Sequence, residues 1–128
     1  MTTSPRVLLV APTSRIATTV SAGLIDAGLR VTLVTSFKAA RKALESTPDL
    51  LISEVRLGEY NGLHLALRAQ IRGIRAIVIG VLDLVTQRDA ATFGAAYLED
   101  GCDTTSLHAA VLATGLSRRG RFGRIHAA

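Results

Sequence analysis

Five short apolar segments alternate with stretches of helical periodicity along this chain, and the alternation limits the folds that it can adopt. These segments are rich in Val, Ile and Leu, and they occupy residues 6–11, 30–35, 49–55, 76–82 and 95–99. Continuous apolar runs of this kind are typical of parallel strands that are covered on both faces. Because crossovers between parallel strands are right-handed, the sequence predicts an α/β fold, a three-layer sandwich around a five-stranded parallel sheet.

The stretches between the strands place apolar residues at the three- or four-residue spacing of an amphipathic helix. The expected inward-facing residues are Ile16, Val20, Leu24 and Ala27 in the first helix, Phe37, Ala40 and Leu44 in the second, Leu63, Leu67 and Ile71 in the third, and Leu107, Val111 and Thr114 in the fifth. The fourth helix, at about residues 85–93, has a weaker pattern because Thr and Asp interrupt it. The expected helix caps are Thr13 or Ser14, then Ser36, and finally Thr105 or Ser106.

A chain of 128 residues is long enough to form one domain, which we place at residues 1–117, before a basic tail or linker at 118–128. Four of the 15 Lys and Arg residues lie in that tail, so the remainder, with 10 Asp and Glu, is close to neutral. The single cysteine cannot form an internal disulfide, and neither a secretory signal nor a membrane-spanning run is present. We therefore expect a cytoplasmic protein without a membrane partner.

Two stretches of the sequence resemble those of a known protein family. PDLLISEVRLGEYNGLHLALRAQ, residues 48–70, combines a buried strand, a polar loop and an Asn-Gly pair at the start of a helix. Together with FGAAYLEDG, residues 93–101, it resembles the receiver domain of two-component response regulators over about residues 6–117. The resemblance implies a flavodoxin-like (CheY-like), doubly wound sheet order and a role in phosphorelay signal transduction.

Receivers accept a phosphoryl group on an aspartate, next to a divalent ion and to cationic and hydroxyl groups that bind the product. By the resemblance, Glu54 occupies the phosphoacceptor position, one methylene longer than aspartate. The other family positions fall on Ala11 and Pro12 for the metal-binding acidic pair, Gly80 or Val81 for the hydroxyl, Asp100 for the lysine and Tyr97 for the switch aromatic. Only the aromatic residue is retained, so the resemblance implies a degenerate pseudo-receiver that is not an enzyme and requires no cofactor or metal.

Glu54 has two interpretations at this point. Its longer side chain can bring negative charge close to the place of a phosphoryl group and so mimic an activated receiver. Alternatively, it is a solvated acid at a strand end, or one that pairs with Arg15 or Arg56.

A receiver-like domain that is not phosphorylated would act through contact with a protein, such as a kinase, an output domain or a second copy of itself. The resemblance implies that the fourth helix, fifth strand and fifth helix form the face on which a homodimer would assemble. The alternative is an α/β domain that binds nucleic acid in transcriptional regulation, through the tail residues Arg118, Arg119, Arg121 and Arg124. Neither a Gly-rich phosphate loop nor metal-ligand spacing of His and Cys supports a further class of site.

Overall fold

The computed structural model describes residues 4–81 and 83–116. Its main sheet has five parallel strands in the order β2-β1-β3-β6-β7. These strands are β1 (Arg6–Val10), β2 (Arg30–Val34), β3 (Leu50–Glu54), β6 (Arg75–Gly80) and β7 (Ala95–Glu99). A separate antiparallel hairpin consists of β4 (Arg56–Leu57) and β5 (Tyr60–Asn61). The strand order is that of the flavodoxin-like fold, as predicted.

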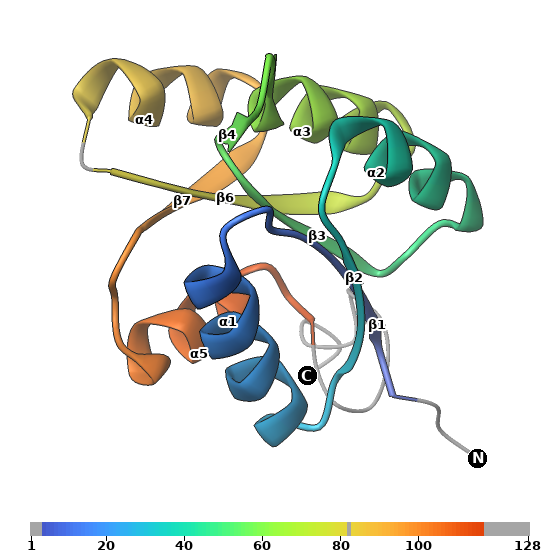
Figure 1. The fold of residues 1–128 in the computed structure, drawn as a ribbon, viewed down its shortest axis with the longest axis vertical. Coiled ribbons are helices and arrows are strands. Elements are labelled where there is room, and N and C mark those ends of the chain that lie inside the picture. Colours follow the sequence, from blue (N-terminus) through green and yellow to red (C-terminus); the bar gives the residue numbers. More distant parts are fainter. Residues whose placement is uncertain (1–3, 82, 117–128) are drawn as a thin grey trace.

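Five α-helices connect the strands and cover both faces of the sheet. They are α1 (Ser14–Asp26), α2 (Phe37–Ala43), α3 (Gly62–Ile71), α4 (Leu84–Thr92) and α5 (Thr104–Ala113), and a 3-10 helix, η1 (Leu44–Ser46), follows α2. Figure 1 shows α1 and α5 on one face and α2, α3 and α4 on the other. This arrangement confirms the three-layer sandwich. None of the helices in the described ranges has the length and apolar character needed to span a bilayer.

The sheet divides the hydrophobic core into two halves, because successive side chains of a strand point to opposite faces. Leu9 packs in the half that contains Leu24 of α1 and Leu107 of α5. Its neighbour Leu8 packs in the other half, with Leu65 of α3. All five residues of the central strand β3 are buried. The end of β3, where Glu54 lies, is therefore fixed by core packing on both faces of the sheet.

Most of the predicted helix faces are confirmed. In α1, Ile16 and Leu24 are buried, and the backbone turns at Gly28 with a φ of 88°. In α2, the Ser36 hydroxyl accepts a hydrogen bond from the Ala39 N–H, as expected of a cap. In α5, the predicted inward-facing residues are all buried: Leu107, Val111 and Thr114.

The predicted inner face of α3 is wrong beyond its first residue. Leu67 is 38% exposed and Ile71 is 78% exposed, whereas the buried side chains further along the helix are Leu65, Ala66 and Ala69. The reason is that α3 carries apolar residues on nearly every side, so that a four-residue spacing fits more than one face.

The predicted cap of α5 is also wrong. Asp103 takes the N-cap position, and its carboxylate accepts a hydrogen bond of 2.8 Å from the Ser106 N–H. Asp caps a helix at least as well as Ser or Thr, so the earliest polar residue with the required backbone conformation fills the position.

The Asn-Gly pair before α3 has a structural explanation. The Asn61 side chain accepts a hydrogen bond of 2.7 Å from the Leu63 N–H and caps the helix. A Cβ atom on Gly62 would lie 2.1 Å from the Glu54 carbonyl oxygen and 2.8 Å from the Ser53 hydroxyl oxygen. Only glycine lets α3 begin this close to the backbone of β3.

Candidate functional site

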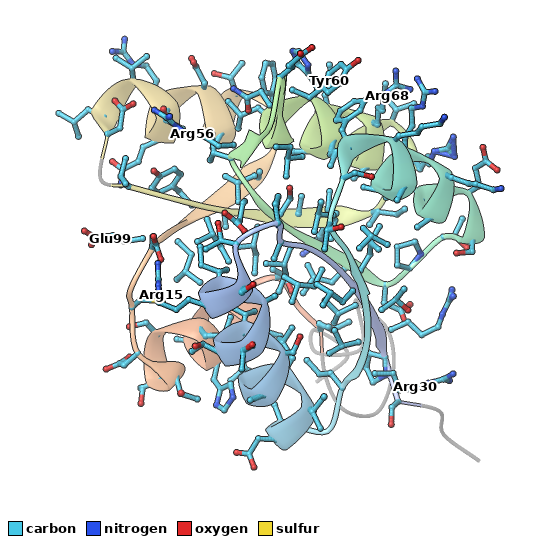
Figure 2. All side chains as sticks on the ribbon, in the orientation of Figure 1. Arg15, Arg30, Arg56, Tyr60, Arg68 and Glu99 are labelled. Atoms are coloured by element: carbon cyan, nitrogen blue, oxygen red, sulfur yellow. The ribbon has the colours of Figure 1, made fainter. Side chains whose placement is uncertain are left out.

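A cleft of about 320 Å³ lies at the carboxyl ends of β3, β6 and β7. Ligand sites of open α/β sheets form at this edge. The ionisable and hydroxyl side chains that line the cleft are Glu54, Arg56, Asp83, Thr86, Tyr97 and Asp100. The labelled side chains of Arg15 and Glu99 project at this end of the sheet, on the left of Figure 2. Glu54, Gly80, Val81, Tyr97 and Asp100 all line this cleft, and the family roles that the resemblance gives them stay predictions.

Glu54 is buried at the end of β3 and is only 7% exposed. Both of its carboxylate oxygens bind Thr13, the residue immediately before α1. Oε2 accepts a hydrogen bond of 2.9 Å from the Thr13 N–H, and Oε1 accepts one of 2.8 Å from the Thr13 hydroxyl. The carboxylate therefore ties the β1–α1 loop to the end of the central strand.

This contact corrects two expectations. Thr13 occupies the N-cap position of α1, but its side chain makes no cap hydrogen bond, because the hydroxyl is directed to Glu54. Glu54 is neither solvated nor, within the described residues, in an ion pair with Arg15 or Arg56. The hypothesis that Glu54 mimics a phosphoryl group stays a prediction.

Asp100, which the resemblance aligns with the lysine of receivers, pairs with a cation. Nη2 of Arg15, on α1, lies 3.1 Å from both Asp100 carboxylate oxygens. The side chain of Arg15 is 61% exposed, so solvent screens the pair and its energetic contribution is small. Its main effect is on charge, since the guanidinium neutralises the acid at this corner of the cleft.

Tyr97 occupies the space beside Gly80 in which a side chain would lie. A Cβ atom on Gly80 would be 2.8 Å from the Tyr97 hydroxyl oxygen and 3.0 Å from a Val55 methyl carbon. The Tyr97 hydroxyl donates a hydrogen bond to the Val81 carbonyl, while the Val81 side chain is 67% exposed. Burial raises the pKa of Tyr97, and the charges of Asp83 and Glu99 raise it further. The phenol of Tyr97, from β7, therefore fills the space beside the end of β6, where the resemblance places the hydroxyl residue of receivers.

Asp83 and Thr86 also line the cleft, and the sequence analysis did not predict them as site residues. The Asp83 carboxylate accepts hydrogen bonds from the Thr86 hydroxyl at 2.7 Å and from the Val85 N–H at 3.0 Å. These hydrogen bonds, that from the Thr86 hydroxyl first, lower the pKa of Asp83. The sequence did contain a signal for them, because Asp83 stands three residues before Thr86 at the start of a helix and Asp is a favoured N-cap residue.

The residues present do not suit the divalent ion that receivers use. Ala11 is buried in the core and Pro12 is exposed, and neither offers a ligand oxygen on its side chain. Over residues 4–81 and 83–116 there is no group of three or more His, Cys, Asp or Glu side chains that could hold a metal ion. Both oxygens of Glu54 already bind Thr13, so the donor set differs from the carboxylate pairs that hold Mg²⁺.

The cysteine and the histidines in the described ranges lie in structural settings. Burial raises the pKa of the Cys102 thiol, and the neighbouring charge of Asp103 adds to this effect, so little thiolate exists at neutral pH. His108 on α5 lies with Nε2 2.9 Å from the Gly23 carbonyl oxygen on α1. His64 is exposed on α3.

Part of the face predicted for dimerisation is core, and its role in dimerisation stays a prediction. Leu98, Leu107 and Val111 are buried, and Phe93 and Tyr97 are packed against the core. The exposed apolar side chains on these elements are Leu84 and Val85 at the start of α4 and Leu112 on α5, and exposed Val81 lies beside them in sequence, just after β6. The arginines of the tail, Arg118, Arg119, Arg121 and Arg124, lie outside the described residues, and their role stays a prediction.

Comparison with solved structures identifies the class of fold. The chemotaxis response regulator CheY4 of Vibrio cholerae superposes with a TM-score of 0.76 at 21% identity, over 87% of this chain and 98% of that one. A putative response regulator from Chloroflexus aurantiacus gives a TM-score of 0.80 at 21% identity, over 87% and 97% of the two chains. The signal receiver domain of the putative response regulator NarL from Mycobacterium tuberculosis gives 0.76 at 20% identity, over 87% and 95%.

These similarities show that the chain has the CheY-like receiver fold. Neither the protein-family models nor the curated proteins to which the sequence was compared give a match.

Proposed function

We propose that this chain is a receiver-like signalling domain that works through protein contact and does not take part in phosphoryl transfer. The observation that carries the proposal is the state of Glu54, whose two carboxylate oxygens both bind Thr13. Phosphoryl transfer to a carboxylate requires one oxygen to be free for in-line attack. It also requires positive charge around the transferred oxygens.

The charges around the cleft support the same proposal. The acids Asp83 and Asp100 line it together with Glu54, and Arg56 is the cation among the lining residues. The guanidinium of Arg15 is already paired with Asp100. Phosphorylation of Glu54 would replace its single carboxylate charge by the roughly two negative charges of a phosphoryl group, in a cleft whose lining contains no lysine. Coulomb repulsion therefore disfavours the phosphorylated product.

An exposed apolar cluster next to the cleft supports protein contact. Val81, Leu84 and Val85 are 67%, 74% and 59% exposed, and they follow one another closely at the start of α4. Clustered exposed apolar residues mark interaction surfaces more often than scattered ones do. A kinase, an output domain or a second copy of the chain would each cover this cluster.

The test is incubation of the full chain with Mg²⁺ and acetyl phosphate or phosphoramidate, followed by intact-mass analysis. We expect no increase in mass, and a receiver that is known to phosphorylate itself in the same mixture controls for the reagent. The Glu54→Gln variant is analysed in parallel. One added phosphoryl group on the natural chain that is absent from the variant would overturn the proposal, because it would identify Glu54 as an acceptor.

A further inference from the structure

Positive charge is concentrated over part of one side of the sheet, along α2, the β4–β5 hairpin and α3, whereas α4 on the same side carries Arg88 and Asp89 and is capped by Asp83. The cations along α2, the β4–β5 hairpin and the α3 helix with its C-cap are Lys38, Arg41, Lys42, Arg56, Arg68 and Arg72, and the carboxylates there, counting η1, are Glu45 and Glu59. All six cations are exposed, and none has an ion-pair partner within the described part of the chain. On the opposite side, α1, α5 and the loop before α5 carry Asp26, Asp100 and Asp103 with Arg15.

A stacked aromatic pair lies on the positive side, in which Phe37 is half-buried against the core and Tyr60 is exposed. The rings of Phe37, at the start of α2, and Tyr60, in β5, stack with centroids 4.6 Å apart and an angle of 17° between their planes. Tyr60 is nevertheless 56% exposed. Since Phe37 covers one face of the Tyr60 ring, this exposure belongs largely to the other face and the edge. A further planar ring can therefore stack on Tyr60.

The cations of α2 line an open groove on the exposed side of this helix. The groove has a volume of about 500 Å³ and is lined by Ser36, Lys38, Ala39, Arg41, Lys42 and Glu45. Three cations and one carboxylate thus face this groove. Figure 2 shows Tyr60 and Arg68 together along the upper side of the molecule, where α2 and α3 lie. Stacking on Tyr60 and phosphate contacts with the cations of α2 and α3 are therefore available on the same side of the sheet.

We propose that this surface binds single-stranded nucleic acid. A base stacks on Tyr60, while Lys38, Arg41, Lys42 and Arg68 bind the phosphates that flank it. Proteins that bind single strands without sequence preference combine a positive groove with exposed aromatic rings in this way. The cations alone would suit an acidic protein equally well, and the open face of Tyr60 is what favours a base. The proposal does not depend on the signalling role of the cleft.

The test measures fluorescence anisotropy of labelled oligo-dT and oligo-U of about 20 nucleotides, which exceeds the usual site size of one small domain. The full chain is titrated at about 50 mM salt and then at rising salt, because phosphate contacts make the affinity salt-dependent. Tyr60→Ala should weaken binding about tenfold, and Tyr60→Phe, which keeps the stacking ring, should restore it. Far-UV circular dichroism of each variant establishes that it is folded.

Two sets of charge variants complete the experiment. The affinity for a single strand falls with salt with a slope, in log units, of about −0.7 for each phosphate contact. The double variant Lys42→Gln and Arg68→Gln loses two such contacts, so its slope should be shallower by about 1.4. Arg30→Gln is the matched control, since Arg30 is an exposed cation on β2 and lies far from Tyr60 in Figure 2. We expect this control to bind as the natural chain does.

Three results would overturn the proposal. The first is that the natural chain binds neither oligonucleotide. The second is that replacing Arg118, Arg119, Arg121 and Arg124 together by Gln abolishes binding while Tyr60→Ala has no effect, which would assign the activity to the tail. The third is that labelled polyglutamate binds as tightly as oligo-dT and that Tyr60→Ala weakens the binding of neither ligand. This result would indicate a general surface for anions.

Discussion

Substitutions of Glu54 test the contact that joins the end of β3 to α1. The side chain is 7% exposed and makes two hydrogen bonds, of 2.9 Å and 2.8 Å, to Thr13. Three changes separate its length, charge and hydrogen-bonding capacity. Glu54→Gln keeps the length and loses the charge, Glu54→Asp keeps the charge and loses one methylene, and Glu54→Ala loses all three.

The expected losses of stability follow from these two hydrogen bonds. Each hydrogen bond to a charged group contributes about 1.5–3 kcal/mol. Thr13 is exposed, so water replaces Glu54 on its N–H and hydroxyl. The lower end of the range therefore applies to each hydrogen bond, and Glu54→Ala should lower the free energy of unfolding by about 3 kcal/mol.

The other two variants should differ from Glu54→Ala in opposite directions. Gln can accept from the Thr13 N–H with its oxygen and donate to the Thr13 hydroxyl with its amide, so the loss should be about 1 kcal/mol. Asp does not reach Thr13 with both oxygens, and it leaves a carboxylate in a buried position without its partners. Its loss should equal or exceed the roughly 3 kcal/mol of Glu54→Ala.

The assay is equilibrium unfolding in urea at pH 7, followed by far-UV circular dichroism of the full chain. Thr13→Val serves as the companion variant, because it removes the hydroxyl and keeps the backbone N–H. We expect the natural chain to be the most stable, followed by Glu54→Gln and then Glu54→Ala. Glu54→Asp should be as stable as Glu54→Ala or less stable. A Glu54→Asp variant as stable as the natural chain, or a Gln variant no better than Ala, would refute the reasoning.

Two further predictions concern other parts of the structure. Gly62→Ala should lower stability by about 3 kcal/mol despite the better helix propensity of Ala, since its Cβ would lie 2.1 Å from the main-chain oxygen of Glu54. In the same urea assay Gly23→Ala should stay within about 1 kcal/mol of the natural chain, because its Cβ would meet side-chain ends and no backbone, at 2.9 Å from Leu107 Cδ2 and 3.7 Å from Thr104 Cγ2. Equal losses for the two glycine variants would contradict the argument. At high concentration we expect the chain to sediment as a dimer through the exposed apolar cluster, and Leu84→Asp should make it monomeric. Ile25→Asp, at a residue 61% exposed on α1, should leave the dimer unchanged, and a chain that is monomeric throughout would exclude a second copy as the partner.

The architecture could be predicted from the sequence because its signals are local and repeated. The apolar runs at residues 6–11, 30–35 and 49–55 each contain a strand, and together with turn and cap signals they specify the alternation of elements. The inner face of α3 could not be predicted, because apolar residues surround the helix and only its packing against the sheet selects the buried ones. Element type thus follows from pattern, whereas the choice among similar faces follows from tertiary contact.

The contacts within the cleft could be predicted only in part. The positions of Glu54 and Asp100 at strand ends follow from the order of the strands. Their partners do not, because Thr13 is 41 residues from Glu54 and Arg15 is 85 residues from Asp100 along the chain. Several polar side chains of similar reach stand near each strand end. Which of them bind one another depends on details of loop backbone that no short-range pattern encodes.

The close approach of Gly62 to β3 has a consequence for how such sequences are interpreted. The requirement for glycine comes from the carbonyl oxygen of residue 54, and every residue has a carbonyl oxygen. Gly62 would therefore be needed whether the side chain at residue 54 reacts with phosphate or holds a loop. A sequence signature of this kind indicates that two segments of backbone pack closely together. It does not indicate whether the neighbouring carboxylate is chemically active.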